Sequence, residues 1–178
     1  MPKRQEDQHK PVTQKRPGFF TRSELSRWLG ASRNSVQEIA RRFNFRGIEG
    51  LYPEDEIFRQ VLGIAVNGDA ERALLRVPLK NARWVSRETG VPGSTLRRKV
   101  REGSFAYTCG IQLGAVSTDG CAARSRRWIP CIVQALARGE DAPHFTPAVA
   151  QSFETERGNN PFAEMIACSA RSAPHRPE

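Results

Sequence analysis

The sequence predicts a mainly α-helical chain with small β wings, arranged as two tandem winged helix-turn-helix units. Two observations carry this prediction: short amphipathic helical patterns meet at a glycine turn, and the same pattern returns sixty residues later. The positions of turn and helix-boundary residues divide the chain into five predicted segments. These are a flexible basic arm over residues 1–17, a first unit over 18–64, a linker helix over 65–78, a second unit with a long wing over 79–139, and a mostly irregular acidic tail over 140–178.

The first unit opens with the signals of two short helices. Thr21 is followed three residues later by Glu24, which is the capping-box pattern of a helix start. Gly30 is expected to end this helix, and Ser32 to cap the next one. Apolar residues repeat at helical spacing on one face of each helix: Leu25, Trp28 and Leu29, then Val36, Ile39, Ala40 and Phe43.

A small wing and a third helix are expected to complete the first unit. Residues 46–50 can form a tight hairpin, because glycines lie at both ends of its loop. Pro53 suits a first helical position, and the acidic residues 54–56 suit the positive end of a helix dipole. An apolar stripe then runs to Gly63, which can close the helix.

The second unit repeats the first at an offset of sixty residues. The matched positions are those that a helix-turn-helix needs, and they pair as Leu25 with Val85, Gly30 with Gly90, Val36 with Leu96, and Phe45 with Phe105. After Phe105 the chain takes a longer path to Trp128, and the glycines along it favour a longer β-hairpin wing. A last helix is expected from Pro130 to about Gly139.

The charge of the chain favours a polyanionic partner. The 178 residues carry a formal net charge of +9, and DNA or RNA is the commonest partner of such a surface. A ribosome-associated or merely soluble basic protein is the alternative. Basic residues gather in the arm and in the middle of the chain, whereas the tail is mildly acidic.

Each second helix of a pair is expected to enter a DNA major groove with its N-terminal half toward the bases. The candidate DNA-binding residues are Arg33, Asn34, Gln37 and Arg41 in the first unit, and Ser94, Thr95, Arg97, Arg98 and Arg101 in the second. Arginine suits guanine, and asparagine or glutamine suits adenine. Arg41, Lys99 and Arg101 are expected at phosphates, as are the wing residues Arg124, Arg126 and Arg127. For each arginine, a solvated helix face or strand is the alternative.

Two segments resemble a known group of modules. "LSRWLGASRNSVQEIARR" and "VSRETGVPGSTLRRKVREG" resemble the winged helix-turn-helix modules of phage and plasmid excisionases and of the related AlpA and MerR-type regulators. The second unit, with its long wing, also resembles the amino-terminal DNA-binding module of Mu-type repressors and transposases. The resemblance implies double-stranded DNA as the partner. Two modules in one chain depart from simple excisionases, which usually carry one.

The expected function is sequence-specific DNA binding by a transcriptional regulator of a bacterial or mobile-element operon. One alternative is an architectural, excisionase-like factor for recombination or conjugation. A second alternative is a nucleic-acid-processing accessory protein without catalysis. An RNA-binding protein would call for aromatics on a sheet or a GXXG loop, which the sequence does not offer. A pure protein-interaction module fits poorly with the arginine-rich second unit.

Catalysis and cofactors are not expected. The histidines lie in the arm and tail, and no nucleophile has a base beside it. The four cysteines lack the close pairs of zinc ligands and are expected to be reduced thiols. No apolar stretch suggests a membrane span or a signal peptide, so a cytoplasmic, nucleoid-associated protein without membrane contact is expected. The C-terminal tail is a candidate site for a homo-oligomer or another protein partner.

The two units are expected to form one rigid reader. The linker contains Ala73, Leu74, Leu75 and Val77, which are too apolar for a solvated tether. Trp28 aligns with Glu88, so it does not occupy a core position that both units share. It is therefore expected to fill a surface special to the first unit, against the linker or the second unit. Packing on the basic arm or on Phe19 is the alternative.

Overall fold

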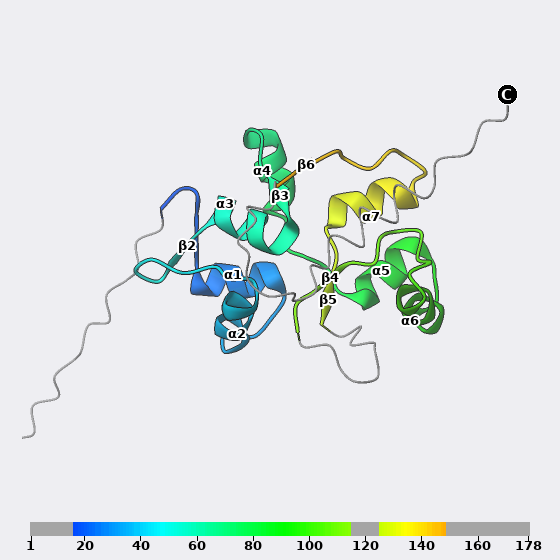
Figure 1. Cartoon of the computed structure of the whole chain (residues 1–178). Coiled ribbons are helices and arrows are strands. Elements are labelled where there is room, and N and C mark those ends of the chain that lie inside the picture. Colours follow the sequence, from blue (N-terminus) through cyan, green and yellow to red (C-terminus); the bar gives the residue numbers. More distant parts are fainter. Residues whose placement is uncertain (1–15, 115–124, 149–178) are drawn as a thin grey trace, which may run out of the picture.

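The computed structural model describes residues 16–114 and 125–148 and confirms the coarse fold class (Figure 1). Helices dominate these residues, and the strands form small two-stranded antiparallel sheets. None of the helices in the described ranges is long and apolar enough to cross a membrane. Most of the basic arm, Arg124 in the wing, and the tail beyond residue 148 lie outside the described residues.

The first unit contains two strands and four helical segments. Its elements are β1 (Phe19–Thr21), α1 (Arg22–Leu29), α2 (Ser35–Arg42), β2 (Leu51–Pro53), α3 (Glu54–Ile57) and the π-helical turn η1 (Phe58–Leu62). Strand β1 pairs antiparallel with β2, with Phe20 opposite Tyr52. This pairing ties the start of α1 to the start of α3 and closes the unit around a core that includes Leu25, Trp28, Val36 and Phe58.

The predicted caps of helix α1 are confirmed. The Thr21 hydroxyl accepts from the Glu24 backbone N–H at 3.2 Å, and the Glu24 carboxylate accepts from the Thr21 N–H at 3.0 Å. Gly30 ends α1 with φ 60°, a left-handed conformation that glycine adopts without steric cost. The expected cap of the next helix differs: the Ser32 hydroxyl accepts from the Ser35 N–H at 3.2 Å in the turn before α2, whereas the N-cap position is Asn34, whose side chain makes no capping hydrogen bond.

The expected hairpin of the first unit forms around two residues. Ile48 and Leu51 exchange backbone hydrogen bonds of 2.7 and 2.9 Å. Glu49 and Gly50 between them both have positive φ, 53° and 78°, which is the requirement of a type I′ turn. Pro53 differs from its expected place: it ends β2, and α3 begins one residue later at Glu54.

The second unit contains a helix pair, then a strand pair and a last helix. Its elements are α5 (Ala82–Thr89), α6 (Gly93–Arg101), β4 (Ile111–Gln112), β5 (Arg126–Arg127) and α7 (Pro130–Ala137). Strands β4 and β5 pair antiparallel. Val85, Leu96, Val133 and Trp128 are central to a separate, smaller core.

The sixty-residue repeat extends to individual hydrogen bonds. Helix α5 has the bounds of α1 shifted by sixty, and Asn81 caps α5 by accepting from the Trp84 N–H at 3.0 Å. The Ser26 hydroxyl donates to the Ala31 carbonyl at 2.8 Å, and the equivalent Ser86 donates to the Val91 carbonyl at 2.6 Å. Gly90, like Gly30, ends its helix with a positive φ, here 69°. The pairing of Phe20 with Tyr52 recurs as a bridge between Lys80 and Trp128.

The linker joins the units through Trp28. Its helix α4 (Asp69–Leu75) follows β3 (Ile64–Ala65). The Trp28 indole N–H donates to the Leu75 carbonyl at 2.8 Å, and the Trp28 carbonyl accepts from the Leu79 N–H at 2.9 Å. Trp28 therefore packs against the linker, as one of the two expectations had it, and its ring also neighbours Phe20. Leu75 is buried, whereas Leu74 and Val77 stay exposed, so only one face of the linker packs.

Part of the tail returns to the first unit, which the sequence did not predict. Strand β6 (Thr146–Pro147) pairs antiparallel with β3, and Phe145 packs against the core of the first unit. The Ala148 N–H donates to the Gly63 carbonyl at 2.8 Å. Figure 1 shows this segment (orange) crossing from α7 to β3, so residues 140–148 strap the second unit to the first.

Candidate nucleic-acid interface

Helix α2 presents the predicted polar face to solvent. Arg33, Asn34, Gln37 and Arg41 are all exposed, because Val36 and Ile39 turn the opposite face into the core. Within the described residues, no hydrogen bond or ion pair involves the side chain of Asn34, Gln37 or Arg41. These side chains are therefore available to a ligand in the positions that the sequence predicted.

Helix α6 carries a denser row of cations. Ser94, Arg97, Arg98 and Arg101 are exposed, and Thr95 is half-buried. The Arg97 Nε–H donates to the Gly93 carbonyl at 3.1 Å, so this guanidinium lies back along its own helix. Leu96 and Val100 anchor the helix on its buried side. The predicted residues of the second unit thus share one outward surface, with Thr95 at its edge.

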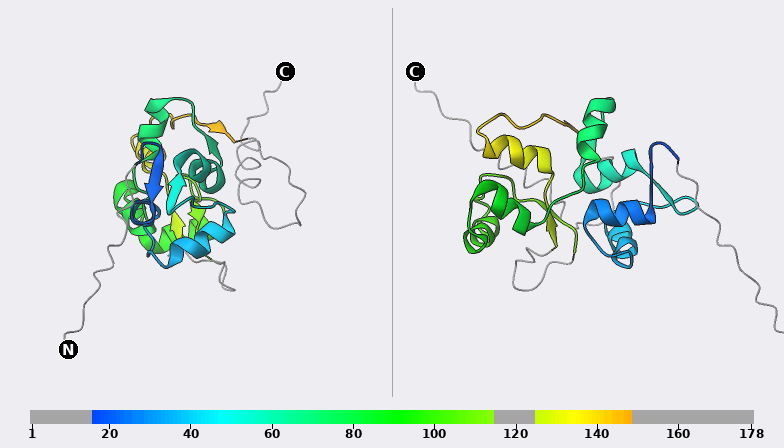
Figure 2. Two further views of the ribbon diagram at one scale, coloured as in Figure 1. Left: turned by 90° about the vertical axis from the view of Figure 1, so that its left-hand side faces the viewer. Right: turned by 180° about the vertical axis from the view of Figure 1, so that it is seen from behind.

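Two helices of this kind lie on the same side of the molecule. Figures 1 and 2 show α2 (blue) and α6 (green) at the lower side in every view, and α4 and β6 at the upper side. The β4–β5 hairpin lies between the two helix pairs (Figure 1). The structure therefore places both helices on one side of the molecule.

Arg126 and Arg127 of the wing are half-buried, and their guanidinium groups donate to backbone carbonyls of the protein itself. Arg127 donates through Nε to the Leu29 carbonyl at 3.0 Å and through Nη2 to the Gly30 carbonyl at 2.6 Å. Arg126 donates through Nη1 to the Cys109 carbonyl at 2.8 Å. This corrects the expectation that these two arginines meet phosphates. Arg124 lies outside the described residues.

The Arg127 guanidinium joins the two units. The carbonyls of Leu29 and Gly30 end α1, where the helix dipole is negative, so a cation there is stabilising. Burial lowers the pKa of Arg127 from its ordinary value, but an arginine remains charged at neutral pH. Sequence reasoning missed this contact because the partner carbonyls are almost one hundred residues away along the chain.

The hairpin and the first unit meet at two further points. Arg42 at the end of α2 donates to the Gly114 carbonyl just after β4. Ile111 and Leu113 of the hairpin are buried in the core of the first unit. The hairpin therefore packs between the two units as a wedge, in contact with both. These contacts fix the position of α2 relative to α6.

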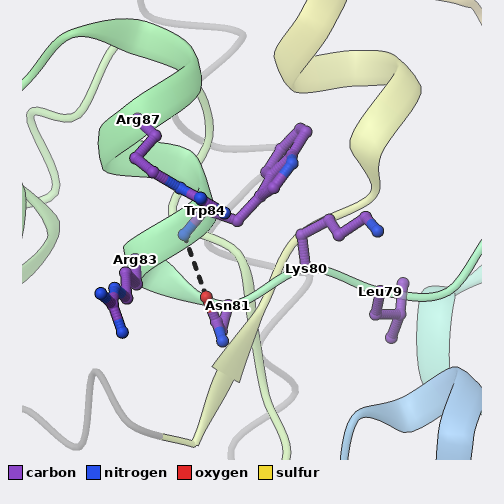
Figure 3. Close-up of a pocket in the computed structure, with 6 residues that line it drawn as sticks. All are labelled: Leu79, Lys80, Asn81, Arg83, Trp84 and Arg87. Atoms are coloured by element: carbon purple, nitrogen blue, oxygen red, sulfur yellow. Dashed lines mark hydrogen bonds between the residues drawn. The ribbon is translucent and has the colours of Figure 1, made fainter.

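A pocket at the start of α5 is lined by basic and aromatic side chains that the sequence analysis did not select. Figure 3 shows this pocket, which we call the α5 pocket; its volume is about 450 Å³, and it is lined by Leu79, Lys80, Asn81, Arg83, Trp84 and Arg87. Lys80, Arg83, Trp84 and Arg87 recur at the spacing of one helical face. That periodicity is a signal that a sequence search for basic faces could have found.

The described residues include two cysteines but no cluster of metal ligands. No group of three or more His, Cys, Asp or Glu side chains that could hold a metal ion occurs within residues 16–114 and 125–148. Cys131 is half-buried, and burial raises the pKa of its thiol, so it is protonated at neutral pH and a poor nucleophile.

Comparisons with known proteins leave the geometry as the guide to function. Protein-family models, curated proteins and solved structures yield no match to this chain. The functional reading therefore rests on three features of the described residues. These are the exposed polar faces of α2 and α6, their placement on one side of the molecule, and the rigid junction that the hairpin makes between them.

Proposed function

We propose that this chain is a sequence-specific double-stranded DNA-binding protein that reads DNA through two winged helix-turn-helix units. The repeat of helix, glycine turn and exposed second helix carries the proposal, because it recurs at an offset of sixty residues with the same left-handed glycine and the same serine hydrogen bond at the turn. Helices of this kind enter the major groove with their N-terminal residues toward the base edges. Arg33, Asn34 and Gln37 would read one half-site, and Ser94, Arg97 and Arg98 the other.

The two half-sites should differ in sequence. Asn34 and Gln37 offer the donor and acceptor pair that suits adenine, whereas Arg97 and Arg98 suit guanine. Arg41 and Arg101, one turn further along each helix, suit phosphates. Because one chain supplies both helices, the protein acts as a built-in pseudo-dimer, with half-sites about one helical turn of DNA apart.

We propose transcriptional regulation of a bacterial or mobile-element operon as the biological role. An architectural role in recombination or conjugation is the second candidate, and the wedge of the hairpin favours it. Arg127 and the apolar residues Ile111 and Leu113 hold the units together, so the DNA has to conform to a fixed spacing of the two helices. DNA whose relaxed shape does not match that spacing would bend, at a cost that depends on its sequence.

The test is a mobility-shift titration against duplexes selected from a random pool. Asn34→Ala and Arg98→Ala should each weaken the selected complex by about 1–3 kcal/mol, which is the value of one good base contact. They should leave the affinity for an unrelated duplex within a few-fold. Arg59→Ala is the matched control, because Arg59 is an exposed arginine in η1 and belongs to neither α2 nor α6.

A salt titration separates base contacts from phosphate contacts. Arg41→Ala should reduce the slope of log affinity against log salt by about 0.9, the value expected for one lost phosphate contact. Equal affinity of the wild-type chain for every duplex, unchanged by Asn34→Ala or Arg98→Ala, would contradict specific reading by the two helices.

A further inference from the structure

The α5 pocket is basic without carboxylates to balance it. Three cations line it, namely Lys80, Arg83 and Arg87, and no Asp or Glu does. None of the ion pairs within residues 16–114 and 125–148 involves any of the three. Three uncompensated cations around one hollow favour an anionic ligand, and a phosphate is the anion that paired guanidinium groups suit best.

The pocket is also lined by an aromatic side chain that is only partly buried. Trp84 is half-buried, whereas Trp28 and Trp128 are 2 % and 1 % exposed. The Lys80 ammonium lies 6.0 Å from the centre of the Trp84 ring, and Figure 3 shows the indole standing beside Lys80 and Arg87. A phosphate group does not stack on an indole ring, whereas a nucleic-acid base does. Each stacked base adds substantially to the affinity of a protein for a nucleotide strand.

The first unit shows that the fold does not require this arrangement. At the positions equivalent to Lys80, Arg83 and Trp84 it has Phe20, Ser23 and Glu24. Glu24 completes the capping box of α1, because its carboxylate accepts from the N–H of the N-cap residue. An indole cannot accept that bond, so at the start of α5 the cap is made by Asn81 alone. Of the four pocket residues on this stripe, only Arg87 keeps its type, as Arg27. The aromatic and two of the cations are therefore additions of the second unit.

We infer that the α5 pocket binds a nucleotide with an unpaired base, which stacks on Trp84 while Arg83 and Arg87 hold its phosphate. This goes beyond duplex reading by α2 and α6, because the bases of a duplex are stacked on each other and cannot reach an indole. The nucleotide can come from two sources, a free mononucleotide or an unpaired position in a nucleic-acid strand. The volume of about 450 Å³ lies within the range of small-ligand pockets.

Tryptophan fluorescence of the full chain tests this inference. The titrants are adenosine monophosphate and an eight-nucleotide single strand that cannot pair with itself. A stacked base should quench Trp84, and the other two indoles are buried and insensitive to it. Quenching by both titrants identifies the free nucleotide as sufficient, and quenching by the strand alone shows that neighbouring phosphates contribute. Both results support the inference.

Variants separate this site from general charge. Arg83→Ala combined with Arg87→Ala should weaken strand binding about tenfold or more, and Arg27→Ala, the equivalent of Arg87 in the first unit, should not. In an anisotropy assay with a labelled strand, Trp84→Ala should lose affinity that Trp84→Phe retains, because phenylalanine still offers a ring for stacking. Circular dichroism checks that each variant is folded.

Three results would overturn the inference. The first is the absence of quenching by either titrant. The second is competition by inorganic phosphate or a blunt duplex as effective as that by the strand, which would make the pocket a plain anion or backbone contact. The third is an equal loss in Arg27→Ala. Failure here is distinct from failure of duplex reading, because Asn34 and Arg98 lie outside the pocket and their variants report on the duplex alone.

Discussion

At the scale of single residues, the side chain of Arg127 joins the two units by hydrogen bonds. It leaves β5 of the second unit and places two N–H groups on the last carbonyls of α1 in the first. Helix ends leave such carbonyls without intrahelical partners, and a charged donor satisfies two of them at once. The residue thus positions the two units relative to each other at their junction.

Replacing Arg127 should destabilise the whole chain. Arg127→Ala removes the two charge-assisted hydrogen bonds that join β5 to the end of α1, and each hydrogen bond to a charged group contributes about 1.5–3 kcal/mol. The free energy of unfolding, measured in urea, should fall by about 3–6 kcal/mol for the two bonds together. Arg59→Ala, at an exposed position, should leave it nearly unchanged. Equal stability of the two variants would show that Arg127 does not hold the junction.

Glu54 anchors the linker in a similar way. Its side chain is fully buried, and its Oε1 accepts from Arg76 at 2.9 and 2.6 Å, while Arg72 lies 3.8 Å from Oε2. The sequence assigned this carboxylate to the helix dipole alone. Its burial against two arginines of the α4 region shows that it also joins the linker to the first unit.

Glu54→Gln should destabilise the chain by about 1–3 kcal/mol, because it leaves Arg76 without its counter-charge in a partly buried site. The single variants Glu54→Gln and Arg76→Gln, combined with the double variant, measure the coupling between the two groups by urea unfolding. The exposed pair of Arg138 with Glu140 is the control, and Arg138→Ala should have little effect. Additive losses for Glu54 and Arg76 would contradict a direct pair.

At the scale of elements, the repeat gives each helix pair the same local design. Both first helices begin at a side-chain cap and end at a left-handed glycine. Both turns are closed by a serine hydroxyl on a carbonyl five residues ahead. The two turns differ in their surroundings: an added Cβ at Gly30 would lie 3.0 Å from Arg127 Nε, whereas at Gly90 it would meet nothing within 4 Å.

This difference predicts unequal effects of the same substitution. Gly90→Ala should cost about 1–2 kcal/mol, the strain of an L-residue in the left-handed region. Gly30→Ala should cost more, since it adds the displacement of the Arg127 guanidinium to the same strain. Thermal unfolding of Gly30→Ala and Gly90→Ala measures how much more stability the first variant loses. In chains that also carry Arg127→Ala, the two losses should become equal. A larger loss for Gly30→Ala that persists there would show that another contact causes it.

At the scale of the whole molecule, three connections join the units. They are the linker against Trp28, the hairpin with Arg127, and the strap of residues 140–148. Two cores remain distinct, yet Ile111, Leu113 and Phe145 from outside the first unit pack on its core. Such sharing favours one cooperative unfolding unit, since neither half retains its full core alone.

Removing the strap should weaken the first unit. A chain ending at Gly139 loses Phe145 and the β3–β6 pairing, and its stability should fall by about 1–3 kcal/mol, the value of burying one large apolar side chain. The intact chain should unfold in one transition by calorimetry. Two transitions in the intact chain, each reproduced by an isolated half, would show that the units are independent.

Local sequence determined the parts of the fold that depend on near neighbours. The capping box of Thr21, the glycine ends of α1 and α5, and the hairpin at Glu49–Gly50 follow from residues a few positions apart. The exposed faces of α2 and α6 follow from helical periodicity in the same way. These features were predictable because caps, turns and amphipathic faces are short-range properties of a chain.

Only the tertiary structure decided how the two units meet. Three contacts show this: Arg127 with Leu29 and Gly30, Glu54 with Arg76, and strand β6 with strand β3. The residues that they join are from 22 to 98 positions apart in the sequence. No local pattern marks such partners, because a guanidinium on a strand looks the same whether it faces a phosphate or a helix end. The sequence by itself determined the two helix pairs and their polar faces, and the long-range packing decided which cations remain on the surface to bind.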